Sequence, residues 1–223
     1  MRRKVGFYEK YVKRGFDFTL SLMALIILSP LFLVLIIAGT IAMKGNPFYT
    51  QQRPGKNEKI FRLIKFRTMS NEKDAEGNLL PDEKRLNKYG IFLRSTSLDE
   101  IPELVNILRG ELSIIGPRPL LVSYLPYYTA KEHHRHDVTP GLTGLAQVSG
   151  RNYVTWEEKF RLDLKYVKHL SFSLDLYVFL KSIFVVLKRD SIETASVIEH
   201  DGVTYQPLDV ERAECMKSKG ITK

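Results

Sequence analysis

The feature that most constrains the fold is an uncharged apolar stretch of 26 residues near the start of the chain, from Phe18 to Met43. About 20 apolar residues suffice for an α-helix to cross a bilayer, so a single spanning helix is the simplest interpretation. A cleaved signal peptide is disfavoured, because the run exceeds the usual apolar length of about 7–15 residues and no small-residue cleavage site is clear. The stretch therefore predicts a membrane helix.

Two features argue against a straight span. Ser29-Pro30 lies near the centre of the stretch, where proline removes a helix hydrogen bond and favours a kink, and where the Ser29 hydroxyl can bond a freed carbonyl. Both flanks are also basic: residues 1–17 hold six basic and two acidic residues, and residues 44–67 hold seven and one. Positive charge at both ends is satisfied at once if both ends return to the cytoplasm. The pattern favours a re-entrant membrane helix kinked at Ser29-Pro30.

The same charge distribution limits the class of partner. Outside the two flanks and the apolar stretch, residues 68–223 hold 21 basic and 22 acidic residues, so the net charge of +9 is concentrated around the apolar stretch. This is typical of an anchor held against anionic lipid, whereas a nucleic-acid-binding face would be spread over the folded body. The single cysteine, Cys215, excludes an intrachain disulfide and a cysteine metal cluster.

After the apolar stretch the pattern changes to that of a mixed domain. Two runs typical of strands, separated by the turn-forming Pro54-Gly55-Lys56-Asn57, predict one β-hairpin over about residues 48–67. Its second strand carries Arg62, Lys65 and Arg67, which either face solvent or contact phosphates. From Trp156 onward the sequence is helical. We expect an α+β fold, mainly α-helical, with the kinked re-entrant helix, one hairpin and interfacial helices.

The domain organisation follows from these patterns. We expect an N-terminal interfacial segment and membrane helix over residues 1–43, a cytoplasmic domain over 44–190 and a C-terminal tail over 191–223. A helix within residues 171–188 is rich in Phe, Leu and Val, so it is either core or a second interfacial contact.

An adjacent pair of carboxylates, Asp99 and Glu100, stands in what the sequence predicts to be the first turn of a helix. Ser97 is a good N-cap residue, and Glu100 lies three residues later, at the spacing of a capping box. That accounts for Glu100 as a structural residue but leaves Asp99 unexplained. A helix start also favours bound phosphate, and a carboxylate that meets phosphate groups normally needs a divalent cation between them.

Several candidate phosphate-binding cations lie near this pair in the sequence. Arg94 precedes it by five residues, and Arg118 stands between Pro117 and Pro119, whose rings stiffen the backbone that presents it. The glycine-rich segment 140–151 adds Gln147 and Arg151, and its glycines allow close approach of the backbone to a ligand. Alternatives stay open, because Arg118 can be a solvated turn residue and glycines also serve turns. The run 133–136, with three histidines, favours a polar helix face over a metal site.

Seven segments, taken in order, match the motifs of one family. They are Lys13-Arg14-Gly15-Phe16-Asp17, Ser29-Pro30, Gly45-Asn46-Pro47-Phe48, Lys65-Phe66-Arg67-Thr68-Met69, Ser97 to Leu104, Gly116-Pro117-Arg118-Pro119 and Gly141-Leu142-Thr143-Gly144. From about Tyr11 to Asp190 the chain resembles the bacterial sugar transferase family, the monotopic phosphoglycosyl transferases that start glycoconjugate assembly on polyprenyl phosphate. The short body resembles the minimal, PglC-like members. The family usually has Trp at Leu145 and Asn at Ser149, and these departures concern the local loop contacts and the sugar preference, not the acidic pair.

The resemblance implies a ping-pong reaction. Asp99 attacks the β-phosphate of a UDP-sugar, with an N-acetylated sugar as the first expectation, releases UMP and holds the phosphosugar as an acyl phosphate. Undecaprenyl phosphate then accepts the phosphosugar. Glu100 helps as a base or by positioning, and Mg²⁺, held in part by Asp99, offsets phosphate charge. The residues expected to bind substrate are Lys65, Arg67, Arg94, Arg118, Gln147 and Arg151.

The resemblance also implies a location and partners. We expect the bacterial inner membrane, with the catalytic domain on its cytoplasmic face, no nucleic acid, and either a second copy of the chain or downstream glycosyltransferases as further partners. Two alternatives belong to other classes. One is a non-catalytic membrane-anchored scaffold in which Asp99 and Glu100 only begin a helix. The other binds anionic lipid or nucleic acid through its basic flanks, and the near-neutral body counts against it.

Overall fold

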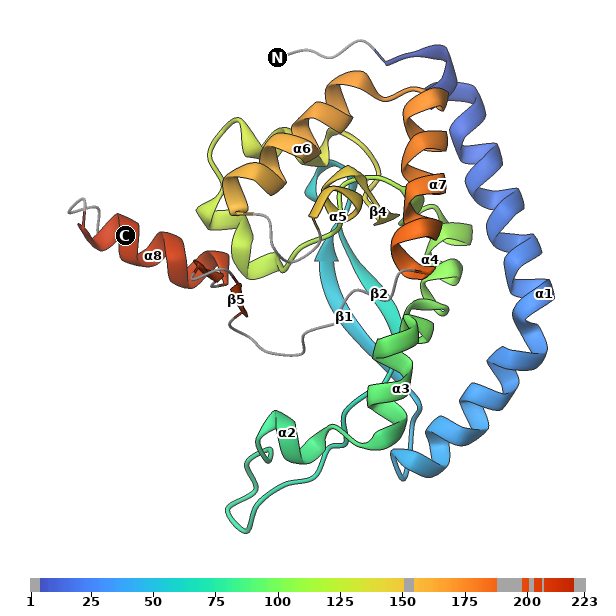
Figure 1. Ribbon diagram of the computed structural model, residues 1–223, viewed down its shortest axis with the longest axis vertical. Helices are drawn as coiled ribbons and strands as arrows, with labels where there is room; N and C mark the ends of the chain where they lie inside the picture. Colours follow the sequence, from blue (N-terminus) through green and yellow to red (C-terminus); the bar gives the residue numbers. More distant parts are fainter. Residues whose placement is uncertain (1–4, 151–154, 188–197, 201–202, 206, 219–223) are drawn as a thin grey trace.

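The computed structural model describes residues 5–150, 155–187, 198–200, 203–205 and 207–218. This part of the chain is mostly helical and contains three two-stranded sheets, which confirms the α+β, mainly helical class (Figure 1). The longer helices are α1 (Lys13–Ala42), α3 (Lys88–Thr96), α4 (Glu103–Arg109), α5 (Leu145–Gly150), α6 (Trp156–His169), α7 (Phe172–Leu187) and α8 (Leu208–Ser218). The strands are β1 (Phe48–Pro54), β2 (Ile60–Phe66), β3 (Ser113–Ile115), β4 (Gly141–Thr143), β5 (Ile198–His200) and β6 (Val203–Tyr205). Shorter helical turns are η1 (Tyr8–Val12), η2 (Lys56–Glu58), α2 (Asp82–Arg85), η3 (Leu98–Glu100), η4 (Val122–Tyr127) and η5 (Glu132–Asp137).

The apolar stretch forms one continuous helix, α1, with Pro30 in its interior. Proline has no N–H to donate to the carbonyl of Ile26 four residues earlier, and the Ser29 hydroxyl donates to that oxygen at 2.8 Å instead. Figure 1 shows that the helix axis changes direction about halfway along. The helix therefore bends near Ser29-Pro30 without breaking.

The beginning of α1 is tied to the body by buried polar contacts. The Lys13 ammonium lies 2.7 Å from a carboxylate oxygen of Asp175 on α7. One turn later, the Asp17 carboxylate accepts hydrogen bonds from the Ser113 hydroxyl at 2.8 Å and from the Ile114 N–H at 3.1 Å. Buried charges are stable only when paired or hydrogen-bonded, so these contacts specify where the helix begins on the body.

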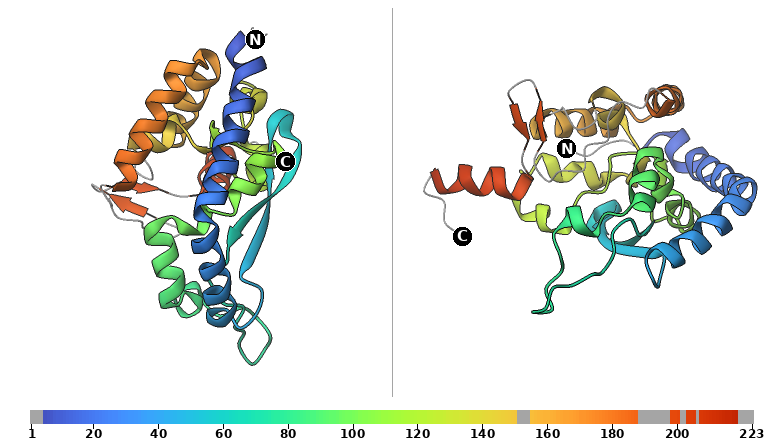
Figure 2. Two further views of the ribbon diagram at one scale, coloured as in Figure 1. Left: turned by 90° about the vertical axis from the view of Figure 1, so that its right-hand side faces the viewer. Right: turned by 60° about the horizontal axis from the view of Figure 1, so that its bottom comes forward.

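The far end of α1 is tied to the same body. The Tyr89 hydroxyl on α3 donates to the Leu35 carbonyl at 2.9 Å, and the Asn87 side chain donates to the Ala42 carbonyl at 3.1 Å. A Cβ added at Gly39 would lie 2.8 Å from the Tyr89 hydroxyl, so the absence of a side chain lets α1 and α3 approach closely. Both ends of the apolar helix are therefore fixed on one folded unit, and the left view of Figure 2 shows α1 running along its length.

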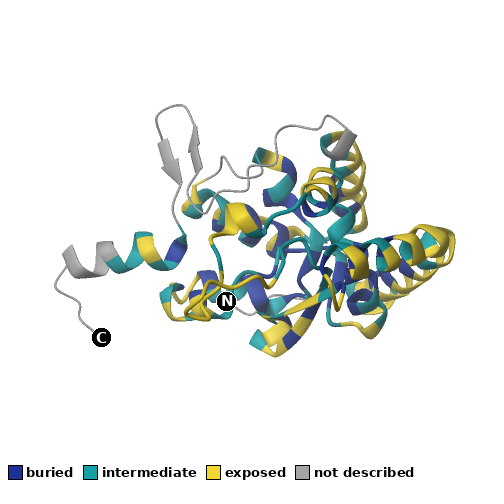
Figure 3. Ribbon diagram, turned by 90° about the horizontal axis from the view of Figure 1, so that it is seen from below, coloured by how far each residue is buried: buried dark blue, intermediate teal, exposed yellow. Residues whose placement is uncertain are grey.

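The middle of α1 is largely uncovered. Its exposed apolar side chains include Met23, Ile26, Ile27, Leu31, Leu33 and Val34. Figure 3 shows the exposed residues on the outer side of this helix. The neighbouring α7 also exposes apolar side chains, including Leu180 and Phe184. Exposed apolar surface on this scale is typical of contact with lipid or protein.

The predicted hairpin is confirmed by β1 and β2, which pair antiparallel from Phe48↔Phe66 to Pro54↔Ile60. Its inner face packs in a core shared with α3 and α4, in which Phe66, Leu93 and Ile107 are buried. Asn106 on α4 is fully buried, and its side chain donates to the Arg62 carbonyl at 2.8 Å and accepts from the Ile64 N–H at 3.0 Å. This amide fixes α4 against β2.

A parallel pair that the sequence did not reveal, β3 and β4, joins Ser113↔Gly141 and Ile115↔Thr143. A Cβ added at Gly141 would lie 2.0 Å from the Gly116 nitrogen, and one at Gly144 would lie 2.1 Å from the Gly116 carbonyl oxygen. We interpreted these glycines as allowing the backbone to approach a ligand. In the structure they allow one backbone segment to approach another, which places the loop after β3 beside β4.

Candidate active site

The acidic pair does not begin a helix in the predicted way. Ser97 is the left-handed residue that ends α3, with a φ of 56°, and its side chain makes no capping hydrogen bond. Asp99 and Glu100 lie in the short turn η3, and α4 starts only at Glu103, after Pro102. The prediction of a capping box at Ser97 is therefore wrong. Neither capping nor helix formation occupies the two carboxylates, which leaves both free for other contacts.

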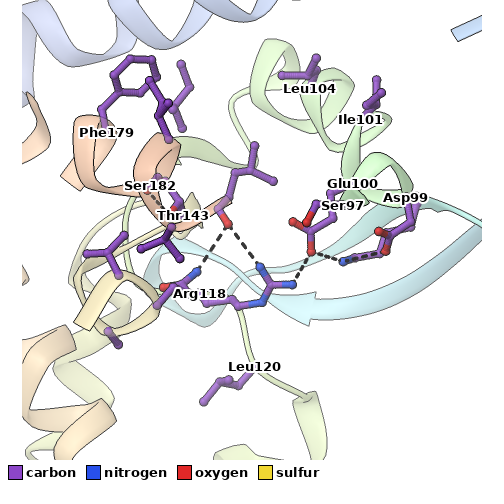
Figure 4. A pocket seen from close by; sticks show the side chains of 18 of the residues that line it. Ser97, Asp99, Glu100, Ile101, Leu104, Arg118, Leu120, Thr143, Phe179 and Ser182 are labelled. Carbon is purple, nitrogen blue, oxygen red and sulfur yellow. Dashed lines mark hydrogen bonds and ion pairs between the residues drawn. The ribbon is translucent and has the colours of Figure 1, made fainter. Parts of the chain in front are cut away.

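Asp99 and Glu100 line a pocket of 940 Å³. Its polar wall comes from β2, α3, η3 and the loop after β3, and includes Lys65, Arg94, Ser97 and Arg118. Its apolar wall includes Ala24 and Leu28 of α1, Ile101, Leu104, and Phe179 and Ile183 of α7. Figure 4 shows Glu100 between Arg118 and Asp99, with Phe179 and Ser182 across the pocket. The pocket thus joins a charged site to the two helices that expose apolar surface.

Arg118, Glu100 and Lys65 follow one another along the polar wall with alternating charge, and Lys65 contacts two further carboxylates. The Arg118 guanidinium pairs with Oε1 of Glu100. The Lys65 ammonium lies 2.6 Å from the same oxygen. Lys65 is also 3.0 Å from Glu103 and 3.9 Å from Asp99. Glu100 is therefore held by two cations at close range, whereas within the described residues Asp99 has one cation, Lys65, at the edge of ion-pair distance. Among these carboxylates, Asp99 is the more available for a ligand.

The electrostatic environment separates the three carboxyl groups. Burial raises the pKa of Asp99, and the neighbouring Glu100 adds to this while Lys65 opposes it. Burial would also raise the pKa of Glu100, but Arg118 and Lys65 outweigh it and hold that pKa below its ordinary value. Burial and the negative charge of Glu100 raise the pKa of Glu103. Glu100 is therefore a weak base and an anchor for two cations, while Asp99 keeps more of its basicity.

Arg118 is held by more than its two flanking prolines. Its side chain also donates to the Leu142 carbonyl at 3.3 Å. Its own carbonyl accepts a hydrogen bond at 2.7 Å from Arg135, whose guanidinium is buried and paired with Asp163 at 2.7 and 3.0 Å. The loop that presents Arg118 therefore rests on a buried ion pair between η5 and α6.

The structure brings most of the predicted substrate-binding residues to one pocket. Lys65, Arg94, Arg118 and Gln147 all line it together with Asp99 and Glu100. Arg94 donates to the Thr68 hydroxyl at 3.0 Å, which orients its guanidinium. Arg67 is half-buried, but it is not among the lining residues, and Arg151 lies outside the described residues. Their predicted roles remain predictions.

Sequence reasoning missed Glu103 and the role of Arg135. The sequence did hold a signal for Glu103. Helical spacing places it beside Leu104 and Ile107 on a buried face, where a carboxylate needs a cation. Asp163 is buried and needs a cation for the same reason, and Arg135 supplies it. Two of the neighbouring histidines face carboxylates as well, His133 against Glu58 and His134 against Asp137.

No group of three or more His, Cys, Asp or Glu side chains that could hold a metal occurs in the part of the chain that the structure describes. Mg²⁺ commonly binds through one or two carboxylates together with substrate phosphates, and does not require a cage made by the protein alone. The Asp99 carboxylate lies on the pocket wall with Lys65 at 3.9 Å, so it fits binding of Mg²⁺ by one carboxylate together with substrate phosphates. The donor set therefore suits a metal ion that binds together with phosphate oxygens.

Comparison with known proteins identifies the family. The model of the bacterial sugar transferase family matches residues 8–189, and the chain belongs to this family. It is therefore an enzyme of the transferase class, as the resemblance implied. The chain is 45% identical over 193 residues to the uncharacterized sugar transferase EpsL of Bacillus subtilis, covering 86% of this chain and 96% of the relative.

Two longer relatives carry more specific names. The UDP-galactose-lipid carrier transferase of Erwinia amylovora is 37% identical over 199 residues, and the undecaprenyl-phosphate galactose phosphotransferase of Salmonella typhimurium is 36% identical over 200 residues. Each match covers 82% of this chain but only 42% of the relative.

Proposed function

We propose that this chain transfers a phosphosugar from a UDP-sugar to undecaprenyl phosphate, giving undecaprenyl-diphosphate sugar and UMP. Membership of the family makes it a phosphoglycosyl transferase. The observation that carries the proposal is the position of Asp99, a carboxylate with one distant cation in a pocket with a charged wall and an apolar wall. Such a pocket suits a soluble diphosphate donor and a lipid-linked acceptor in turn.

In the first step, an oxygen of the Asp99 carboxylate attacks the β-phosphorus of the UDP-sugar. The bond from this phosphorus to the bridging oxygen breaks, and UMP leaves with that oxygen. The product is an acyl phosphate that joins Asp99 to the phosphosugar. In the second step, a phosphate oxygen of undecaprenyl phosphate attacks the same phosphorus and the Asp99 carboxylate is released. A covalent nucleophile thus divides one transfer into two displacements at one site.

The other charged residues stabilise the phosphate groups. Phosphoryl transfer depends mainly on positioning and on fixed cations near the developing charge. Arg118, Lys65 and Arg94 supply that charge, and Glu100 orients Arg118 and Lys65 in place of acting as the base. Asp99 would help to hold Mg²⁺, and the ion would supply charge that offsets part of the diphosphate charge.

The apolar wall of the pocket suits the polyprenyl chain of the lipid acceptor. Side chains of α1 and α7 line the pocket on one side, and both helices expose apolar side chains on the outside. The helix α1 is long and apolar enough to cross a membrane by length and composition. Because both of its ends are tied to the same charged body, we propose that it enters the bilayer and returns, which places the pocket at the cytoplasmic surface.

The reaction is tested by UMP release. Purified protein in nanodiscs, with Mg²⁺ and undecaprenyl phosphate, is expected to release UMP from at least one of a panel of UDP-sugars that includes UDP-galactose, UDP-glucose and N-acetylated sugars. Excess chelator should remove the activity and added Mg²⁺ should restore it. Full turnover in chelator would exclude the metal, and no UMP from any donor would exclude the proposed reaction.

The topology is tested by cysteine labelling in a variant whose natural Cys215 is serine. Tyr11→Cys and Lys44→Cys, at the two ends of α1, should react with a membrane-impermeant maleimide from the cytoplasmic side only. Ile27→Cys, from the exposed middle of the helix, is the matched control and should be protected on both sides. Labelling of the two ends from opposite sides would show that α1 spans the bilayer.

A further inference from the structure

The C-terminal helix α8 lies outside the family-matched residues 8–189, yet it packs on η4 and pairs with η5, the turn that carries Arg135. Leu208, at its start, is fully buried in an aromatic cluster with Tyr124, Tyr128 and Phe160. Because Leu208 has no exposed surface, α8 docks on the body through a specific contact.

One ion pair fixes this helix to the body. The Arg212 guanidinium makes two parallel contacts with the Glu132 carboxylate, at 2.7 and 2.8 Å, and donates to the Tyr127 carbonyl at 2.6 Å. The guanidinium also lies over the Phe160 ring at 5.2 Å. Only 15% of the Arg212 side chain and 11% of the Glu132 side chain are exposed. A bidentate pair of this kind fixes orientation as well as position.

Glu132 begins the short turn η5, and its side chain fixes the start of that turn to the residues before it. Its carboxylate accepts a hydrogen bond from the Thr129 N–H at 2.7 Å. Three residues after Glu132, the same turn carries Arg135, whose guanidinium donates to the Arg118 carbonyl at 2.7 Å. Both Arg212 and Arg135 also contact Phe160. Polar contacts therefore join α8 to the start of η5, and the same short turn, at Arg135, is hydrogen-bonded to the backbone of Arg118.

We propose that Arg212 is a positioning residue for this transferase, which acts through Glu132 and η5 to hold Arg118 in the pocket. The inference rests on the proposed function, since it concerns how the phosphate-binding arginine is placed. Asp163 holds Arg135 independently, so loss of Arg212 loosens Arg118 without releasing it. The C-terminal helix α8 thereby helps to hold a phosphate-binding residue of the active site in place.

The test compares variants of the full chain by initial rates of UMP release per folded enzyme. Arg212→Ala should lower kcat by about three- to tenfold, the effect expected for one coupled contact in a network. Arg212→Lys keeps the charge but loses the bidentate contact, and should recover part of the rate. Arg161→Ala is the matched control, because Arg161 forms an exposed ion pair with Glu158 on α6 and should keep the wild-type rate.

A double-variant cycle separates positioning from stability. In an Arg118→Lys background, Arg212→Ala should cause little further loss, because the guanidinium that it helps to place is already gone. An equal fold-loss in both backgrounds, or an unchanged kcat in Arg212→Ala, would overturn the inference. If Arg212→Ala does not fold, Arg212→Lys and Glu132→Gln carry the same cycle. Absence of UMP release by the wild-type protein would instead reject the proposed function.

Discussion

Replacing Asp99 by asparagine is expected to lower UMP release by at least about 10⁴-fold, the scale of loss seen when a covalent nucleophile is removed. The amide cannot form the acyl phosphate, and it takes away the carboxylate that fits Mg²⁺. The protein should still fold, because the side chain is partly exposed, asparagine has the same shape, and the nearest cation, Lys65, keeps its contacts with Glu100 and Glu103.

A measurement of label bound to the protein completes this prediction. Wild-type protein incubated with a UDP-sugar labelled in the sugar, but without lipid acceptor, should retain label on the protein, and Asp99→Asn should not. Glu100→Gln is the matched control. It should retain label at a reduced rate, because it weakens the hold on Arg118 and Lys65 without removing the nucleophile. Full activity of Asp99→Asn would place the nucleophile elsewhere.

The second large effect is expected at the buried ion pair behind Arg118. Arg135→Met leaves the Asp163 carboxylate buried without a cation, which costs about 3–5 kcal/mol when one partner of a buried pair is removed. For a chain of this length the thermal midpoint should fall by roughly 10 °C. The Arg118 carbonyl also loses its hydrogen-bond donor, so UMP release per folded enzyme should fall.

A double replacement distinguishes the two consequences. Arg135→Met with Asp163→Leu removes both charges, and apolar replacement of a whole buried pair is often neutral for stability. The thermal midpoint should therefore recover, while the rate of UMP release stays low because the donor to Arg118 is still missing. Recovery of both would show that the pair serves stability alone.

The sequence predicted the features that depend on local pattern. The apolar stretch, the turn chemistry of residues 54–57 and the helical spacing after Trp156 gave the bent helix, the hairpin and helices α6 and α7. The candidate residues Lys65, Arg94 and Arg118 came from charge and proline spacing together with the family motifs, and the structure places all three around the pocket.

What the sequence did not predict depends on contacts between distant segments. Ser97 is a residue type that commonly caps the start of a helix. In the structure it adopts the left-handed conformation that ends α3, so the course of the chain in the fold overrides the local signal. Gly141 lies in a glycine-rich segment of the kind that often contacts a ligand. In the structure it pairs with β3 in a parallel sheet instead. Arg135 lies in a run of histidines, and only its approach to Asp163, 28 residues later, reveals its role.

The two tethers at the start of α1 have a consequence for biogenesis. The partner of Asp17 is Ser113, 96 residues further on, and that of Lys13 is Asp175, 162 residues further on. At a synthesis rate of about 5–20 residues per second, the segment from Lys13 to Asp175 takes roughly 8–32 s to make, so α1 is synthesised before its partner on α7 exists. Before these partners are made, the basic flanks and the bend hold the proposed orientation. The contacts with Asn87 and Tyr89 form next, and the ion pair with Asp175 locks the start of α1 once translation is nearly complete.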